Sequence, residues 1–286
     1  MQLDMTKGRP MPIILKFFVP IFIGNMFQQF YNMVDSIIVG RYVGEEAFAA
    51  VGSTGTIMFL VLGFANGLST GFTVLTSQKF GAKDEKGIRQ SVSNAIILSV
   101  IVSVVMTIIS VLSMGALLHL MNTPKNIYHY AYDYIIIITG GTAAVCFYNL
   151  FSALLRAVGN SKAPLFFLIL SAVLNIFLDL LFIIRFRWEV QGAAIATIAS
   201  QAISAVCCLF YILAKVKILV PHRDEWKING HYAKKQLAVG FPMALQFGIT
   251  ASGTLIMQSA INRFGSTAIA GFNASSKVGN LLTQAF

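Results

Sequence analysis

Long apolar runs alternate with short polar segments along the whole chain. Neither Lys, Arg, Asp nor Glu occurs in residues 47–78, 90–124 or 236–262. Each run is longer than the roughly 20 apolar residues with which an α-helix crosses the hydrocarbon core of a bilayer. The pattern predicts membrane-spanning helices over 14–38, 51–76, 91–117, 130–153, 164–184, 190–214 and 237–262, with an eighth that begins near 271.

The composition supports an integral membrane protein and excludes a soluble one. The 286 residues are 56% hydrophobic and 11% charged, whereas a typical soluble domain has about 25% charged residues. The sequence also lacks the HExxH, GxSxG, P-loop and GxGxxG patterns of common catalytic and nucleotide-binding sites. We therefore expect an all-α integral membrane protein that is not an enzyme and has no cofactor.

Positive charge is distributed unevenly between the predicted loops. The formal net charge is +10, which in a soluble protein would suggest a nucleic-acid partner. When alternate loops are assigned to opposite sides, 15 of the 21 Lys and Arg residues fall on the side of the N-terminus and 5 on the other. The positive-inside rule then places the N-terminus in the cytoplasm. We expect a multi-pass protein of a bacterial inner membrane, with the lipid bilayer and not nucleic acid as its partner.

A weak internal repeat divides the chain. Superposing Pro20 on Pro242 aligns Arg41 with Arg263. The two copies start six helices apart, so both enter the membrane from the same side and form a parallel repeat about an axis along the membrane normal. This predicts two six-helix lobes with a cavity between them. The expected parts are a complete first lobe, a basic cytoplasmic linker and the start of a second lobe, over residues 1–214, 215–236 and 237–286.

Two acidic residues lie well inside predicted spans, where a charged side chain costs about 2.5–3.5 kcal/mol at the helix centre, whereas Asp133 lies near the end of its span. Asp35 and Asp179 each precede an arginine of the outer side by six residues. At about 1.5 Å per residue, both should lie roughly 9 Å inside the outer boundary. The span 190–214 starts from the same side, which brings Thr197 to a depth of about 10 Å and Gln201 one turn deeper.

Helical spacing predicts which of these polar side chains share a face, because residues three, four or seven apart lie on one side of a helix. Gln28, Tyr31 and Asp35 form one stripe, and Asn175 and Asp179 form an i, i+4 pair. Two neighbouring carboxylates in a low dielectric favour sharing a proton, because like charges repel. The same oxygens suit a small hard cation such as Na⁺.

We therefore predict a cation-coupling site and, beside it, a substrate pathway. The cation-coupling residues are Asp35, Asp179, Asn175, Thr197 and Tyr31, and Na⁺ is the metal ion for which the first four would provide ligands. Gln28 and Gln201 are assigned to the substrate pathway. In the alternative interpretation, these polar groups only hydrogen-bond neighbouring helices, as polar residues in membrane bundles commonly do.

Proline and glycine positions suggest how the helices bend and pack. Pro20 removes a backbone hydrogen bond inside the first span, which favours either a hinge or a static kink. Gly63, Gly67 and Gly71 form a GxxxGxxxG run. Missing side chains at this spacing allow a close helix approach, so we expect packing there in preference to a substrate pathway.

Five segments carry motifs that occur together. They are residues 20–52 with Gln29, Tyr31, Asp35, Gly40, Gly44 and Ala49-Ala50-Val51-Gly52; Ser77 to Ala82; Leu155 to Asn160; Asn175 to Asp179; and Gly192-Ala193-Ala194 to Thr197. In this combination the whole chain resembles the multidrug and toxic compound extrusion (MATE) family.

The resemblance implies a secondary antiporter of twelve helices, monomeric at full length, that exports amphipathic and often cationic drugs in exchange for H⁺ or Na⁺. Carried over residue by residue, the family's first-lobe cation site falls on Asp35, Asn175, Asp179 and Thr197, with Tyr31 beside it, and the family's bend in its first helix falls on Pro20. Because the span 237–262 contains no acid, the chain is most similar to the DinF-like branch, which couples in the first lobe.

Two other interpretations stay open. A flippase for lipid-linked oligosaccharides has a related fold and should show a cationic central cavity that binds pyrophosphate, for which Lys277 and Arg263 are the candidates. The other is an inactive truncated transporter or a scaffold. Members of the family have twelve helices, so we expect this chain to be C-terminally incomplete relative to them.

Overall fold

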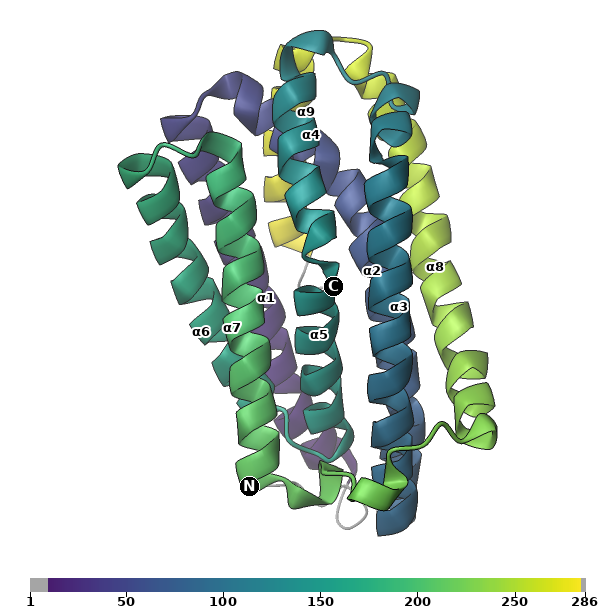
Figure 1. Cartoon of the computed structure of the whole chain (residues 1–286). Helices are drawn as coiled ribbons and strands as arrows, with labels where there is room; N and C mark the ends of the chain where they lie inside the picture. Colours follow the sequence, from purple (N-terminus) through teal and green to yellow (C-terminus); the bar gives the residue numbers. More distant parts are fainter. Residues whose placement is uncertain (1–9, 284–286) are drawn as a thin grey trace.

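The computed structural model describes residues 10–283, which are almost entirely helical and contain no strand (Figure 1). This confirms the predicted all-α class. The helices are α1 (Pro10–Tyr42), α2 (Glu45–Gly81), α3 (Glu85–Leu120), α4 (Lys125–Gly140), α5 (Thr142–Ala157), α6 (Lys162–Asp179), α7 (Glu189–Lys215), α8 (Gly230–Asn262) and α9 (Ser266–Thr283); a π-helix (Leu180–Arg185) continues α6, and two 3₁₀ turns (Lys217–Leu219, Arg223–Glu225) follow α7.

Among the described residues, six helices are each long and apolar enough to cross a membrane, and α4 and α5 pass the same test only when they are taken together as a bent pair. The sequence pattern predicts one unbroken helix over 130–153, but the structure has a bend of 49° between α4 and α5. The break falls at Gly140 and Gly141, and glycine weakens a helix interior. The hydroxyls of Thr139 and Thr142 donate to carbonyls of the preceding turn, which satisfies backbone groups near the break.

The spans extend beyond their predicted ends because their first and last turns are polar. In α2, Glu45 and Glu46 occupy the first turn and Lys79 the last. At the next connection, the Asp84 carboxylate caps α3 by accepting the Gly87 N–H and pairs with the Lys79 ammonium at 2.7 Å. The contact with Lys79 and, to a smaller extent, the hydrogen bond from Gly87 hold the pKa of Asp84 below its usual range.

The glycine run packs α2 against α8, which confirms the packing interpretation. A Cβ added to Gly71 would lie 2.2 Å from the Gly240 Cα, and one added to Gly67 would lie 2.8 Å from the Ala244 Cα. The two backbones are therefore in direct contact along this seam. Since α8 opens the expected second lobe, the seam joins the two expected lobes.

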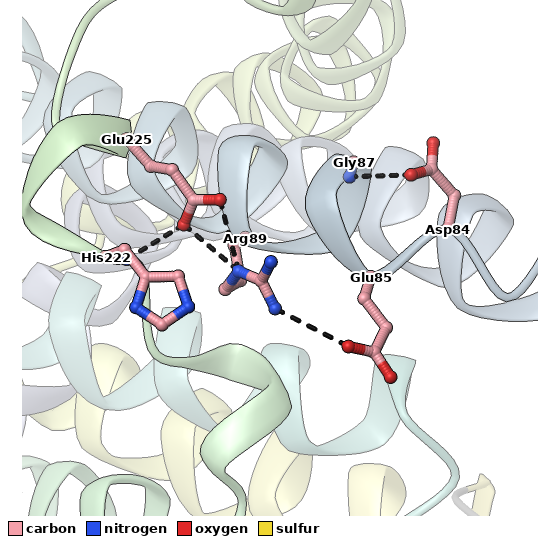
Figure 2. A network of polar contacts seen from close by, with 6 residues as sticks. All are labelled: Asp84, Glu85, Gly87, Arg89, His222 and Glu225. Atoms are coloured by element: carbon pink, nitrogen blue, oxygen red, sulfur yellow. Dashed lines mark hydrogen bonds and ion pairs between the residues drawn. The ribbon is translucent and has the colours of Figure 1, made fainter.

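The connection between α7 and α8 lies against the end of α3, as Figure 1 shows at the bottom of the bundle. Figure 2 shows the contacts that hold it: Arg89 Nε donates to both carboxylate oxygens of Glu225 at 3.1 Å, and Glu225 accepts the backbone N–H of His222. The Asn229 N–H donates to Asn94 on α3. The predicted linker 215–236 is thus docked, and α8 begins at Gly230, so the later part of that range is already helical.

Candidate functional site

The two acids inside the spans lie side by side in the structure. Asp35 is on α1 and Asp179 is the last residue of α6. Their side chains are buried, with exposed fractions of 9% and 0%, and their carboxyl groups are close enough to interact electrostatically. A π-helical turn starts directly after Asp179, and such irregular turns frequently occur at functional sites.

Asn175 and Thr197 complete this cluster from two adjacent helices. Asn175 lies one turn before Asp179 on α6, and its Nδ2 donates to the Thr197 Oγ1 on α7 at 3.4 Å. Asn175 is buried and Thr197 is half-buried. The hydrogen bond orients the amide so that its oxygen is free for another partner.

Four acceptor oxygens of this cluster have no hydrogen-bond donor among the described residues. They are Asp35 Oδ1, both carboxylate oxygens of Asp179 and Asn175 Oδ1. Buried polar atoms in proteins are almost always paired, because an unpaired one loses its hydration without compensation. Oxygens without donors, converging from two helices, fit either a shared proton or a small hard cation.

Tyr31 and Gln201 lie at the edge of the cluster. Tyr31 is half-buried on α1, within reach of Gln201 on α7 and Gln28 on its own helix. Gln28 itself is exposed and lines a different cavity, of about 300 Å³, between α1, α2, α5 and α6. The structure therefore places both glutamines near Tyr31, and Gln28 also lines the second cavity.

Pro20 lies inside α1, which runs as one α-helix through that position. It also lines the 300 Å³ cavity. A hinge at Pro20 stays a prediction.

Tyr134 and Asn273 are absent from the sequence-based prediction, and Lys277 appears there only as a candidate of the flippase alternative. Tyr134 on α4 is buried beside Asp35, Asp179 and Tyr31. It lies near the outer end of its span, so the depth calculation that selected Asp35 would also have selected it. Asn273 and Lys277 come from α9 and line a cavity of about 650 Å³ together with Asp35. No local pattern indicates that α9 packs beside α1.

The ligand types present fit an alkali cation or a proton better than a transition metal. Within residues 10–283, no group of three or more His, Cys, Asp or Glu side chains gathers. The cluster instead offers carboxylate, amide and hydroxyl oxygens, which are the ligands of hard cations.

Within residues 10–283, six apolar helices and the bent pair α4–α5, together with a buried acidic cluster, define a multi-pass membrane protein. The MatE family profile matches residues 20–181, more than half of the chain. The chain therefore belongs to the MatE family, the multidrug and toxic compound extrusion transporters.

Individual relatives agree with this assignment. The chain is 31% identical over 98% of its length to the probable multidrug resistance protein YpnP of Bacillus subtilis, and 28% identical over 94% to the probable multidrug resistance protein NorM of Thermotoga maritima. A solved outward-facing multidrug resistance MATE transporter of the MOP superfamily superposes on 98% of the chain with a TM-score of 0.84 and 25% identity.

The chain spans only part of these proteins. It covers 62% of YpnP, 58% of NorM and 62% of the solved transporter chain. Assignment to the DinF-like branch stays a prediction.

Proposed function

We propose that the chain forms the cation-coupling part of a secondary multidrug antiporter, which exchanges H⁺ or Na⁺ for amphipathic, often cationic drugs. The observation that carries this proposal is the group of donor-less oxygens on Asp35, Asp179 and Asn175. Two neighbouring ionised carboxylates, such as those of Asp35 and Asp179, repel each other strongly in a low dielectric. A bound proton or Na⁺ removes that repulsion, so cation binding changes the energy of packing α1 against α6.

This energy difference would drive alternating access. A cation that enters from outside and binds at Asp35 and Asp179 stabilises one arrangement of α1, and its release to the cytoplasm restores the other. A ligand shifts such an equilibrium by its difference in affinity for the two states. In this proposal the protein lies in the bacterial inner membrane with its N-terminus in the cytoplasm, acts as a monomer and binds drugs between its lobes.

Charge removal at the acids tests the proposal. The natural gene product that contains this chain is expressed in a drug-hypersensitive bacterium, and growth in the presence of cationic drugs is measured. Asp35→Asn and Asp179→Asn should each abolish resistance, whereas Asp224→Asn, an exposed linker acid, should not. Unchanged resistance with normal membrane levels of Asp35→Asn would refute the coupling role. Efflux from proteoliposomes under an imposed pH or Na⁺ gradient then separates the two coupling ions.

The two other interpretations predict different results. A lipid-linked oligosaccharide flippase requires several cations in the central cavity, but only Lys277 among the lysines and arginines of the described residues lines the cavity of Asp35, and Arg263 lines a separate apolar pocket. An inactive scaffold would give no gradient-dependent drug transport with any variant.

A further inference from the structure

The cavity between α1, α2, α5 and α6 is polar and lies away from the acids. It has a volume of about 300 Å³, and none of the described residues that line it is Asp or Glu. These residues belong to the half of the bundle that contains the N-terminus, which faces the cytoplasm in the proposed orientation. The cavity shares no lining residue with the cavity of Asp35.

Arg156, in the last turn of α5, lines this cavity without a counter-charge. Its guanidinium forms no hydrogen bond or ion pair with any residue of the range 10–283. The groups whose charge acts on it are Tyr148 and Cys208, a phenol and a thiol that are neutral at pH 7. A half-buried charge in a membrane bundle is costly when it has no partner. The donors of this guanidinium are therefore available to a ligand.

Ser152 lies one turn before Arg156 on the same face of α5, and both line the cavity. The Ser152 side chain is 2% exposed, and its Oγ has no hydrogen-bond partner among the described residues. A basic residue in the last turn of a helix also interacts favourably with the helix dipole. That interaction leaves the Ser152 hydroxyl unexplained, because buried hydroxyls are almost always paired. A ligand in the cavity would supply the missing acceptor.

The N-terminus of α6 reaches the cavity from a second direction. Ser161, its N-cap residue, is buried, lines the cavity and makes no cap hydrogen bond with its side chain. The Asn160 side chain instead accepts the Ala163 N–H at 3.1 Å. The positive end of the α6 dipole therefore faces the same space as Arg156, which favours a bound anion.

The walls from α1 and α2 contribute amide groups. Asn25 lies on α1, and Asn66 on α2 accepts the Thr70 hydroxyl at 3.4 Å with its Oδ1. This bond leaves the N–H groups of the Asn66 amide for another acceptor. Donors thus surround the cavity from several helices. Such an arrangement matches the tetrahedral oxygens of a phosphate better than the two coplanar oxygens of a carboxylate.

We propose that this cavity binds a phosphate group, whose oxygens accept hydrogen bonds from Arg156, Ser152 and Ser161. Two sources supply this chemistry on the cytoplasmic side: the headgroup of an inner-leaflet phospholipid and a phosphorylated molecule of the cytoplasm. The volume of about 300 Å³ is at the lower limit of small-molecule sites and suits a phosphate with a glycerol-sized group. The bound phosphate bridges the α5–α6 connection to α1 and α2.

Two matched pairs of probes test this proposal and distinguish the sources. The natural gene product that contains this chain is purified free of lipid in a neutral detergent and a phosphate-free buffer. Dioleoyl phosphatidylglycerol is compared with dioleoylglycerol, and sn-glycerol 3-phosphate with glycerol. Apparent affinities follow from the rise of the thermal unfolding midpoint with ligand concentration. We expect a phosphate-bearing probe to bind at least about tenfold more tightly than its phosphate-free partner.

Variants assign this preference to the cavity. Arg156→Gln should weaken binding of the phosphate-bearing probe at least about tenfold, and Arg156→Lys, which keeps the charge but loses the planar fork, about threefold. Ser152→Ala should weaken it several-fold. Lys162→Gln removes an exposed charge at the start of α6, outside the cavity, and should leave the affinity unchanged.

The outcomes decide the site and its ligand. A preference for phosphatidylglycerol alone identifies the lipid headgroup, and a preference for glycerol 3-phosphate identifies the soluble source. No preference in either pair overturns the site. Equal losses in Arg156→Gln and Lys162→Gln also overturn it, because they indicate general attraction of anions to a basic surface.

Two further measurements keep the test independent of folding and of transport. The ligand-free unfolding midpoint of Arg156→Gln should not fall, since no protein partner is lost. If it does fall, Ser152→Ala decides, and an unchanged phosphate affinity in that variant overturns the site. Asp35→Asn should retain the phosphate affinity because Asp35 lines the other cavity, so failure of either proposal does not affect the other.

Discussion

At the scale of single residues, Asp35 and Asp179 are costly inside a membrane and are kept side by side without a donor. Asn175 and Thr197 contribute to the site through one hydrogen bond between α6 and α7. A threonine that only packed these helices together would tolerate replacement by an isosteric apolar residue. A threonine that orients a cation ligand would not.

We therefore predict that Thr197→Val weakens cation coupling. Loss of the hydroxyl removes the partner of the Asn175 amide, so the amide oxygen is no longer held towards the acids. The concentration of H⁺ or Na⁺ that half-activates efflux should rise by up to about tenfold, as for one lost hydrogen bond between neutral groups. Thr197→Ser, which keeps the hydroxyl, is the control. An unchanged half-activating concentration in Thr197→Val would assign the pair to packing.

Contacts between whole elements decide how the two expected lobes meet, and in the α2–α8 seam two helix backbones touch directly. Gly71→Ala should destabilise the protein by about 1–3 kcal/mol, the usual cost of overpacking, because the new methyl group meets the backbone of Gly240, which has no side chain to move. Thermal unfolding in detergent measures this loss. Gly81→Ala on the same helix, where an added Cβ has nothing within 4 Å, should be nearly neutral, and an equal loss in both variants would contradict the seam.

The docked linker gives a second prediction at this scale. Arg89 and Glu225 form a largely buried pair, with side-chain exposures of 18% and 5%, and removal of one partner leaves the other charge uncompensated. Glu225→Gln should therefore release the connection between α7 and α8. Trypsin should then cut this connection several times faster in inside-out vesicles.

The control for Glu225→Gln changes the other carboxylate that contacts Arg89. Glu85 contacts Arg89 at 3.6 Å with a carboxylate that is 70% exposed, so Glu85→Gln should change the cleavage rate little. Equal rates in wild type, Glu85→Gln and Glu225→Gln would mean that the ion pair does not hold the linker.

For the whole molecule, the orientation in the membrane follows from charge. We predict that a cysteine at Asn122, exposed in the α3–α4 connection, reacts with a membrane-impermeant maleimide in intact cells. A cysteine at Lys227 in the α7–α8 connection should react only after permeabilisation. The native Cys146 and Cys208 are buried and Cys207 is half-buried, so both cysteines are introduced into a Cys207→Ser background. The reverse labelling pattern would overturn the orientation with a cytoplasmic N-terminus.

Much of the fold was predictable because a bilayer imposes strong local rules. Each span must be long and apolar, so hydropathy alone located the six long helices and the bent pair α4–α5 of the described residues. The bend itself was not predicted, since Gly140 and Gly141 are tolerated in straight membrane helices as well. The glycine run of α2 was assigned to packing correctly, but its partner α8 could not be identified from a motif that fits any helix.

Part of the candidate site could likewise be predicted from the sequence, and part could not. Asp35, Asp179, Asn175 and Thr197 could be grouped from the sequence, because helix rise converts residue number into depth and the cost of a buried acid marks it as exceptional. Their role in coupling is still a prediction. Gln28 shares a helical face with Tyr31 but lines another cavity, because the neighbours of each helical turn differ.

The sequence by itself therefore determined the membrane class and the spans and predicted the depth of the acids, since these depend on distances along single helices. Only the tertiary structure decided which helices are neighbours: that Tyr134 joins the acids, that α8 lies on the glycines of α2, and that Asn273 and Lys277 face Asp35 across one cavity. The reason is physical. Depth follows from the helical rise and the bilayer, whereas lateral neighbours follow from the fit of many side chains between helices far apart in the chain.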